Sequence, residues 1–248
     1  MRTLSPDQFR AKLFDVLRRK QHWGTSHFTC QTTTKDHLHK LYHQEYVVYI
    51  RDFAVLLARI IGKNPPWEVR RRLATTIYEE ETGGLSFHQP HQELFLQMMI
   101  GLGFDRSGFR DVKLLSSSRI YREWLDHLCE EENWILGATV LTIFVQGTLT
   151  DPEDVMNPKG PKDPTEIEDI ITKHPLVQYQ GLSPKHMDYI RVQQIVEPVN
   201  RRAVYDMVIH HAVEAEQQQY VLQQMEEALR QWTKYQDGIA RSCGLRQS

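Results

Sequence analysis

The feature that most constrains the fold is the spacing of the apolar residues, which recur every three or four positions along most of the chain. Residues three and four apart share one face of an α-helix, so this spacing predicts amphipathic helices. No stretch alternates apolar and polar residues as a half-buried strand does, and no segment repeats. The sequence therefore predicts an all-α fold.

The pattern predicts about seven helices, separated by glycine and proline signals. They fall near residues 5–20, 36–60, 66–82, 94–103, 120–147, 183–196 and 200–235. Between the fifth and sixth, residues 148–174 contain four prolines and many acids, which favours an exposed connection with a short helix at 165–172. We expect residues 1–248 to form a single helical domain, a bundle with one long connection.

The charge balance and the absence of targeting signals restrict the class of protein. The 30 basic and 32 acidic residues are interspersed, so no basic stripe is present to follow a phosphate backbone, and nucleic acid is not an expected partner. No run of about 18 apolar residues and no signal peptide occur, so no membrane role is expected. The three cysteines lie far apart, which is typical of a reduced, cytoplasmic protein.

An acidic segment followed by histidines is the strongest candidate for a chemical site. Glu81 closes the acidic triplet at the end of one expected helix, and His91 begins the next. Carboxylate and imidazole ligands together suit iron, manganese or zinc, so this pair predicts a metal site. His88, seven residues after Glu81, is a second candidate imidazole. The alternative interpretation is a solvated, acidic helix end followed by a histidine cap.

Several short motifs support a family resemblance. They are the run Tyr46-Val47-Val48-Tyr49-Ile50-Arg51-Asp52-Phe53, a Glu-Glu-x-Gly with a His ten residues after its second Glu, His174-Pro175-Leu176 followed by Leu182-Ser183 and Asp188, and the opening Leu4-Ser5-Pro6-x-x-Phe9. Together they resemble the haem-oxygenase-like family, which includes pyrroloquinoline quinone synthase, thiaminase-like proteins and non-haem diiron oxidases. The resemblance implies a haem-oxygenase-like helical bundle.

The resemblance also implies a ligand set for iron. Carried over position by position, the early carboxylate ligand falls on Glu45, the paired ligands fall on Glu81 and His91, and the late carboxylate falls on Asp188. The family's central-helix Glu has no counterpart in residues 141–146. One or two Fe(II) ions are therefore expected, with O2 as co-substrate, and the second ion should be the weaker one.

At the late histidine position this sequence has Arg191. A guanidinium that faces the cavity there could bind a substrate carboxylate through two hydrogen bonds. Because Asp188 lies three residues earlier, a salt bridge on one helix face is the alternative. Tyr46, beside Glu45, is a further candidate catalytic residue, and the group of His210, His211 and Glu214 is a candidate for a displaced ligand.

A cysteine nucleophile of the thiaminase type is not expected. Cys129 is followed by Glu130 and Glu131, and negative neighbours raise the pKa of a thiol.

The first functional hypothesis is an O2-dependent non-haem iron oxidase or oxygenase, acting on a small carboxylate-bearing organic molecule in a biosynthetic pathway. Two alternatives stay open. One is a cofactor-free oxidase resembling pyrroloquinoline quinone synthase, which the missing ligands favour. The other is a non-catalytic helical interaction protein, since a fold does not fix a function. The aromatic helix faces also suit a homodimer.

Overall fold

The computed structural model describes residues 2–158, 160 and 162–247, apart from the side chains of residues 196–200. These residues form helices and connections without any strand, so the predicted all-α class is confirmed. The α-helices are α1 (Pro6–Arg18), α2 (Thr25–Phe28), α3 (Lys35–Glu45), α4 (Phe53–Gly62), α5 (Trp67–Thr82), α6 (His91–Gly101), α7 (Ser116–Glu130), α8 (Trp134–Thr139), α9 (Asp151–Met156), α10 (Pro164–Lys173), α11 (Pro175–Gln178), α12 (Asp188–His211) and α13 (Ala215–Ser242). The π-helices are η1 (Tyr46–Ile50) and η3 (Val140–Val145), and the 3₁₀ helices are η2 (Arg106–Phe109) and η4 (Pro184–His186).

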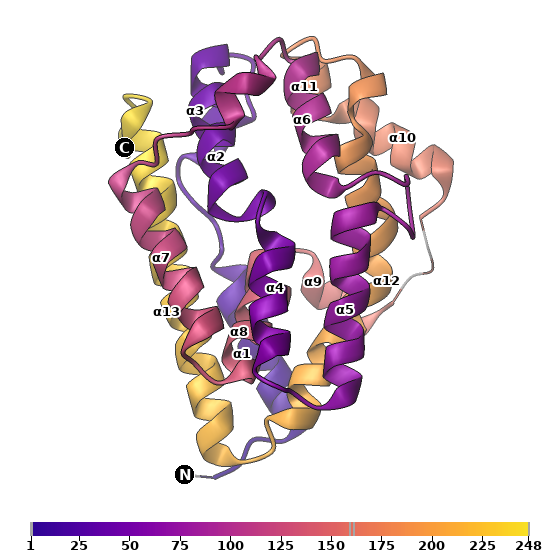
Figure 1. Cartoon of the computed structure of the whole chain (residues 1–248), viewed down its shortest axis with the longest axis vertical. Helices are drawn as coiled ribbons and strands as arrows, with labels where there is room; N and C mark the ends of the chain where they lie inside the picture. The colour runs from indigo at the N-terminus through magenta and orange to yellow at the C-terminus, as the bar shows by residue number, and fades with distance from the viewer. Residues whose placement is uncertain (1, 159, 161, 248) are drawn as a thin grey trace.

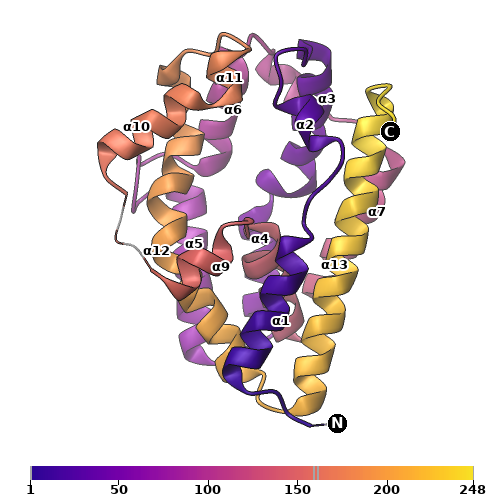
Figure 2. The same ribbon diagram turned by 180° about the vertical axis from the view of Figure 1, so that it is seen from behind.

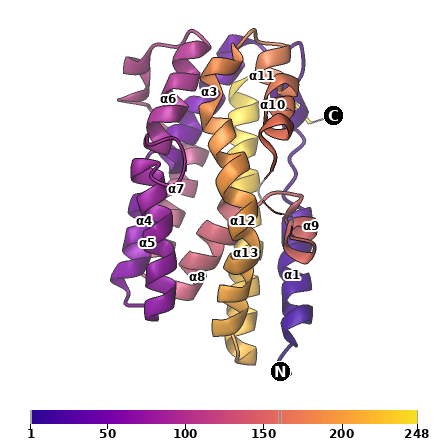
Figure 3. The same ribbon diagram turned by 90° about the vertical axis from the view of Figure 1, so that its right-hand side faces the viewer.

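The longer helices run roughly along the long axis of the molecule (Figure 1). The helices α7 and α13 pack together on one side, and α5 and α12 lie on the other. Between them α8 and η3 contact α13, α12 and α4. Seen from behind, α9 lies beside α12 and next to α1 (Figure 2). The edge view places α4 and α5 on the opposite side of α12 from α1 and α9 (Figure 3).

Two apolar clusters hold this arrangement together. The larger joins residues of α1, α4, α7, α8, η3 and α13, and includes Phe9, Tyr121 and Phe144. The smaller joins α3, η1, α6 and α10 to the start of α12, and includes Phe95 and Met99. Burial of such side chains supplies most of the favourable free energy of folding.

Two helix ends agree with the sequence signals. Ser5 caps α1 in a capping box with Gln8, and Pro6 is the first helical residue. The helix α5 ends at its C-cap Gly83, whose φ of 59° lies in the left-handed region that favours glycine. These two predictions are confirmed.

The predicted helix 36–60 is divided in the structure. The helix α3 ends at Glu45, η1 follows, and α4 starts at Phe53. At the break, the Asp52 carboxylate accepts hydrogen bonds from Arg51, at 2.8 Å, and from Arg122, at 2.7 Å. Apolar spacing continues on both sides of this turn, so periodicity alone gives no sign of it.

The predicted helix 120–147 is also divided. The helix α7 ends at Glu130, and Asn133 caps α8 by accepting a hydrogen bond from the amide of Ile135. The second half then continues as the π-helix η3, in which the turn is wider than in an α-helix. Residues 135–144 are buried, so this part of the chain lies in the centre of the bundle.

The last two helices differ from the predicted boundaries. The helix α12 continues through Pro198 to His211, and α13 begins at Ala215 behind a capping box formed by Glu214 and Gln217. Pro198 predicts a helix end there, whereas the chain turns at residues 212–214, which carry no glycine or proline. The side chains of residues 196–200, next to the expected boundary, lie outside the described part of the chain.

Residues 148–174 are less exposed than the sequence suggested. The short helix expected at 165–172 is α10, but α9 precedes it, and Asp151 and Val155 on α9 are buried. Asp151 pairs with the buried guanidinium of Arg201 on α12, which ties the segment to the bundle. In the described residues no helix is long and apolar enough to cross a membrane.

Candidate active site

A cavity of about 1130 Å³ lies between α5, α6, η3 and α12. Its wall is apolar in large part and also carries carboxylates, imidazoles and guanidinium groups, the usual composition of a small-molecule site. The acidic and basic residues of the wall are Glu45, Glu68, Arg71, Arg72, Glu79, Glu80, His91, His174, Arg201, Asp206, His210 and His211.

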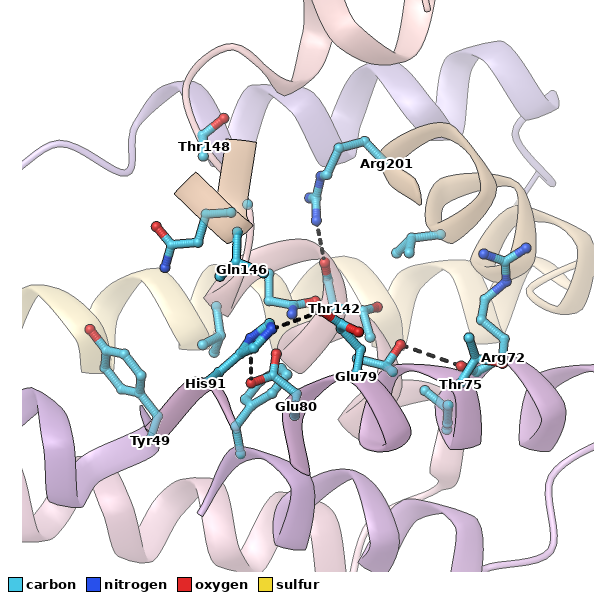
Figure 4. Close-up of a pocket in the computed structure, with 18 of the residues that line it drawn as sticks. Tyr49, Arg72, Thr75, Glu79, Glu80, His91, Thr142, Gln146, Thr148 and Arg201 are labelled. Carbon is cyan, nitrogen blue, oxygen red and sulfur yellow. Dashed lines mark hydrogen bonds and ion pairs between the residues drawn. The ribbon is translucent and has the colours of Figure 1, made fainter. Parts of the chain in front are cut away.

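The turn between α5 and α6 brings carboxylates and an imidazole together. A Cβ atom on Gly83 would lie 2.3 Å from the carbonyl oxygen of Gln89, so only glycine allows the chain to return this closely. His91 is then the first residue of α6, and its ring lies between the carboxylates of Glu79 and Glu80 (Figure 4).

Glu79 is the more buried of the two carboxylates, with 2% of its surface exposed. It accepts hydrogen bonds from the Leu85 amide at 2.6 Å, from the Ser86 hydroxyl and from His91 Nε2 at 3.2 Å. Burial opposes its ionisation, but the hydrogen bonds from Ser86, Leu85 and His91 outweigh burial and lower its pKa. Glu79 is therefore ionised, and both of its oxygens already accept hydrogen bonds.

Glu80 has fewer partners than Glu79. Its Oε2 atom lies 3.0 Å from His91 Nδ1, and its side chain is 16% exposed on the cavity wall. Burial alone would lower the pKa of His91, but the nearby carboxylates of Glu80 and Glu79 outweigh burial and raise it. The imidazole therefore needs a cation, either a proton or a metal ion, between Nδ1 and Glu80.

Glu45, the last residue of α3, also lines the cavity. Burial raises its pKa to about 7, although a hydrogen bond from Tyr49 and the charge of Lys20 act in the opposite direction. A wider π-helical turn follows Glu45 directly and carries Tyr49 and Ile50 into the same wall. Such turns frequently occur at functional sites.

The wall formed by η3 and the residues that follow it carries Thr142, Gln146 and Thr148 in place of a carboxylate (Figure 4). Arg201 donates hydrogen bonds to the Thr142 carbonyl, at 2.8 Å, and to Asp151. Its charge is therefore compensated, and its role in this wall is to hold η3 and α9 together.

Sequence reasoning missed part of the site. In the sequence, Glu79 and Glu80 belong to the same acidic triplet as Glu81, and nothing distinguishes the three. In the structure, Glu79 and Glu80 line the cavity, whereas Glu81 is exposed. His174 also lines the cavity, and burial lowers its pKa. Of the group His210, His211 and Glu214, the two histidines line the cavity with ring centroids 4.9 Å apart, whereas Glu214 caps α13 and does not line it.

The structure places two predicted metal ligands outside the cavity. Glu81 is exposed on the outer face of α5, and His88 is exposed in the turn with a positive φ of 55°. Of the paired residues Glu81 and His91, only His91 faces the cavity. Glu81 points away because one residue along a helix turns the side chain by about 100° relative to Glu80, which does line the cavity.

The predicted substrate-binding and late-ligand residues are engaged elsewhere. Arg191 forms two hydrogen bonds with Glu168, at 2.6 and 2.8 Å, and one with Asp188, at 2.9 Å. Neither Arg191 nor Asp188 lines the cavity, so their arrangement matches the salt-bridge alternative. Tyr46 is buried and stacks on Phe95, with ring centroids 5.6 Å apart, as a packing residue does.

The donor chemistry can be compared with the needs of a metal. Among the described residues, no three His, Cys, Asp or Glu side chains are arranged to hold an ion. The 3.0 Å between Glu80 Oε2 and His91 Nδ1 is about the separation of two neighbouring ligands when each bond is about 2.1 Å long. Among the described side chains, Glu80 and His91 are therefore placed as two neighbouring ligands of one ion would be.

Comparison with known protein families gives a match over most of the chain. A family model described as an iron-containing redox enzyme matches residues 40–233, a stretch that contains every ionisable residue of the cavity wall. No curated protein matches the chain.

Proposed function

The chain belongs to the family of iron-containing redox enzymes, and from this premise we propose that it is an O2-dependent non-haem iron oxidase or oxygenase acting on a small organic molecule. The observation that carries the proposal is the position of His91 between the carboxylates of Glu79 and Glu80, on the wall of the cavity between α5, α6, η3 and α12.

Glu80 and His91 would hold the iron, since Glu80 has no other described partner and Nδ1 faces it. When bound, the iron supplies electrons and a binding place for O2. Glu79 accepts the hydrogen bond from Nε2 and so fixes the tautomer and the orientation of the ring. A carboxylate in this outer position is a usual partner of a ligating histidine.

Glu45 would move protons rather than bind the ion. With a pKa of about 7 it is partly protonated at neutral pH, which suits a general acid or base. Reduction of O2 consumes protons, and Glu45 with Tyr49 can deliver them inside the cavity. This role replaces the ligand role that the resemblance implied for Glu45.

The apolar part of the wall would bind the body of the substrate and exclude water. Phe53, Leu73, Phe95 and Met98 contribute to it. Arg191 is engaged with Glu168, so the proposal no longer assigns the substrate carboxylate to Arg191.

A cofactor-free oxidase is the second candidate. The observation in its favour is that no three potential ligands converge in the described residues. In that case the imidazolium of His91 would polarise an electron-rich substrate directly. The two candidates differ in one measurable respect, since only the first loses O2 consumption when iron is removed.

The proposal is tested by loading the protein with Fe(II) without oxygen, desalting it, and measuring iron per chain and O2 uptake with a chemical reductant. Wild type and Glu81→Ala should retain about one iron per chain, since Glu81 is exposed, whereas Glu80→Gln and His91→Ala should retain little. Absence of iron in wild type, or equal iron in all four proteins, would contradict the proposal. The biosynthetic role, the cytoplasmic location and the homodimer remain predictions.

A further inference from the structure

A second polar group lies on α5, two turns before the Glu79 and Glu80 pair. Arg72, Thr75, Thr76, Glu79 and Glu80 all line the cavity. Their offsets of three, four, seven and eight residues place them on one face of the helix (Figure 4). The same helix therefore presents a cation at one end of the cavity and carboxylates at the other.

Arg72 differs from Arg191 and Arg201 because no acid is paired with its guanidinium in the described residues. Its side chain is half-buried, yet within the described part of the chain its guanidinium donates no hydrogen bond and forms no ion pair. By contrast, Arg201 is held by Asp151, and Arg191 is held by Glu168 and Asp188.

The acids near Arg72 have other partners. Asp206 pairs with Arg10 at 3.2 Å and with Arg202 at 3.7 Å. Glu68 lies 3.6 Å from His211. The neighbouring Arg71 packs over the ring of Trp67, with 4.8 Å to the centroid, and adds positive charge.

A half-buried guanidinium without an ion-pair partner is costly, and this cost is recovered when an anion binds. Burial and the charge of Arg71 lower the pKa of Arg72, while Asp206 acts in the opposite direction. Arginine nevertheless keeps its charge in proteins, and its planar fork matches a carboxylate with two parallel hydrogen bonds.

We propose that Arg72 is an anion-binding subsite that holds the carboxylate of the substrate, at the opposite end of the cavity from Glu80 and His91. Calling the anion a substrate rests on the proposed function, whereas the subsite itself rests only on the placement of Arg72.

The helix geometry defines the class of substrate. Eight residues separate Arg72 from Glu80, which corresponds to roughly 12 Å along the helix axis. Apolar side chains, including Leu73 and Phe95, line the same cavity. The carboxylates of Glu79 and Glu80 repel an anion, so the acid group is directed to Arg72. The substrate is an organic acid with an apolar body, and it is oxidised at the end remote from its carboxylate.

The test uses two probes of nearly equal shape, phenylbutyrate and its neutral amide phenylbutyramide, titrated by calorimetry into iron-free protein. Wild type should bind the carboxylate roughly 10- to 100-fold more tightly than the amide, as a charge-assisted bidentate pair allows. Arg72→Gln should lose this preference while its affinity for the amide stays unchanged. The control Arg191→Gln should keep it, because Arg191 lies outside the cavity.

Two outcomes would overturn the subsite: an undiminished carboxylate preference in Arg72→Gln, or an equal loss for both probes. If Arg72→Gln does not fold, Arg72→Lys replaces it, since lysine keeps the charge but loses the fork. Arg72→Lys should then bind the carboxylate more weakly, and an unchanged preference would overturn the proposal. Because the protein is iron-free, a failure of iron binding leaves this test intact and refutes only the proposed function.

Discussion

The clearest test of the turn between α5 and α6 compares two glutamates of the same acidic triplet, Glu79 and Glu81. The Glu79 carboxylate is buried and accepts from three donors, whereas Glu81 is exposed. In Glu79→Gln, one oxygen becomes an amide group that only donates. At least one of the donors, the Leu85 amide, the Ser86 hydroxyl or the His91 ring, then loses its acceptor.

The magnitude follows from these contacts. A hydrogen bond to a charged acceptor contributes about 1.5–3 kcal/mol, and a buried donor left without a partner costs about 1–3 kcal/mol. Since the amide keeps one accepting oxygen, we expect Glu79→Gln to lower the free energy of unfolding by about 2–4 kcal/mol. Glu81→Gln, the matched control, should change it by less than about 0.5 kcal/mol.

The assay is urea denaturation of metal-free wild type, Glu79→Gln and Glu81→Gln, followed by circular dichroism. Hydrogen exchange adds local information, because loss of the Glu79 contacts should raise the exchange rate of the amides of residues 83–90. A Glu79→Gln protein as stable as wild type, or a larger loss in Glu81→Gln, would refute the assignment of Glu79 as the inner carboxylate.

Three further predictions concern stability and reactivity. Burial disfavours the charge of Asp52, but hydrogen bonds from Arg51 and Arg122 outweigh burial and lower the pKa of this carboxyl group. The ionised Asp52 therefore stabilises the fold above the unfolded pKa of about 3.9, and this stabilisation is lost as the pH falls through the lower folded pKa. Urea denaturation should therefore show that Asp52→Asn loses about 1–3 kcal/mol at pH 7 and much less near pH 2, and equal losses at both would contradict this. Gly83→Ala should lower the midpoint of thermal unfolding, since it combines a positive φ with a clash against Gln89, whereas Gly62→Ala, at an open helix end, should leave the midpoint unchanged or raise it. Burial raises the pKa of Cys129 to about 12, and a hydrogen bond from Thr32 lowers that of Cys30, so mass spectrometry after iodoacetamide treatment should find Cys30 alkylated before Cys129, and the reverse order would contradict the buried position.

The sequence predicted the helices well because apolar spacing and end signals are local. Ser5 and Gly83 act through neighbouring backbone atoms, and both ends were predicted correctly. The break at Asp52 was missed because it depends on Arg122, a residue distant in the sequence. The turn at residues 212–214 was missed for a different reason. The capping box of Glu214 and Gln217 is a local signal, but Pro198 is a stronger helix-end signal in the sequence.

The site was predicted less completely than the fold. Spacing identified the acidic segment and His91, but the choice among three consecutive glutamates depends on the helix phase, which the packing of α5 against α4 and α6 determines. Arg191 was expected in the cavity because of its position in a family pattern, yet Glu168 on α10 holds it outside. Arg72 had no local signal, because what distinguishes it is that the surrounding acids have other partners.

X-ray absorption at the iron edge of the Fe(II)-loaded protein would report directly on the ligands of the ion. If Glu80 and His91 hold a single ion, the spectrum should show nitrogen and oxygen ligands, the scattering pattern of one imidazole and no neighbouring iron, and the imidazole pattern should be lost in His91→Ala. A second iron near the first, or an imidazole pattern that persists in His91→Ala, would contradict a single ion held by Glu80 and His91.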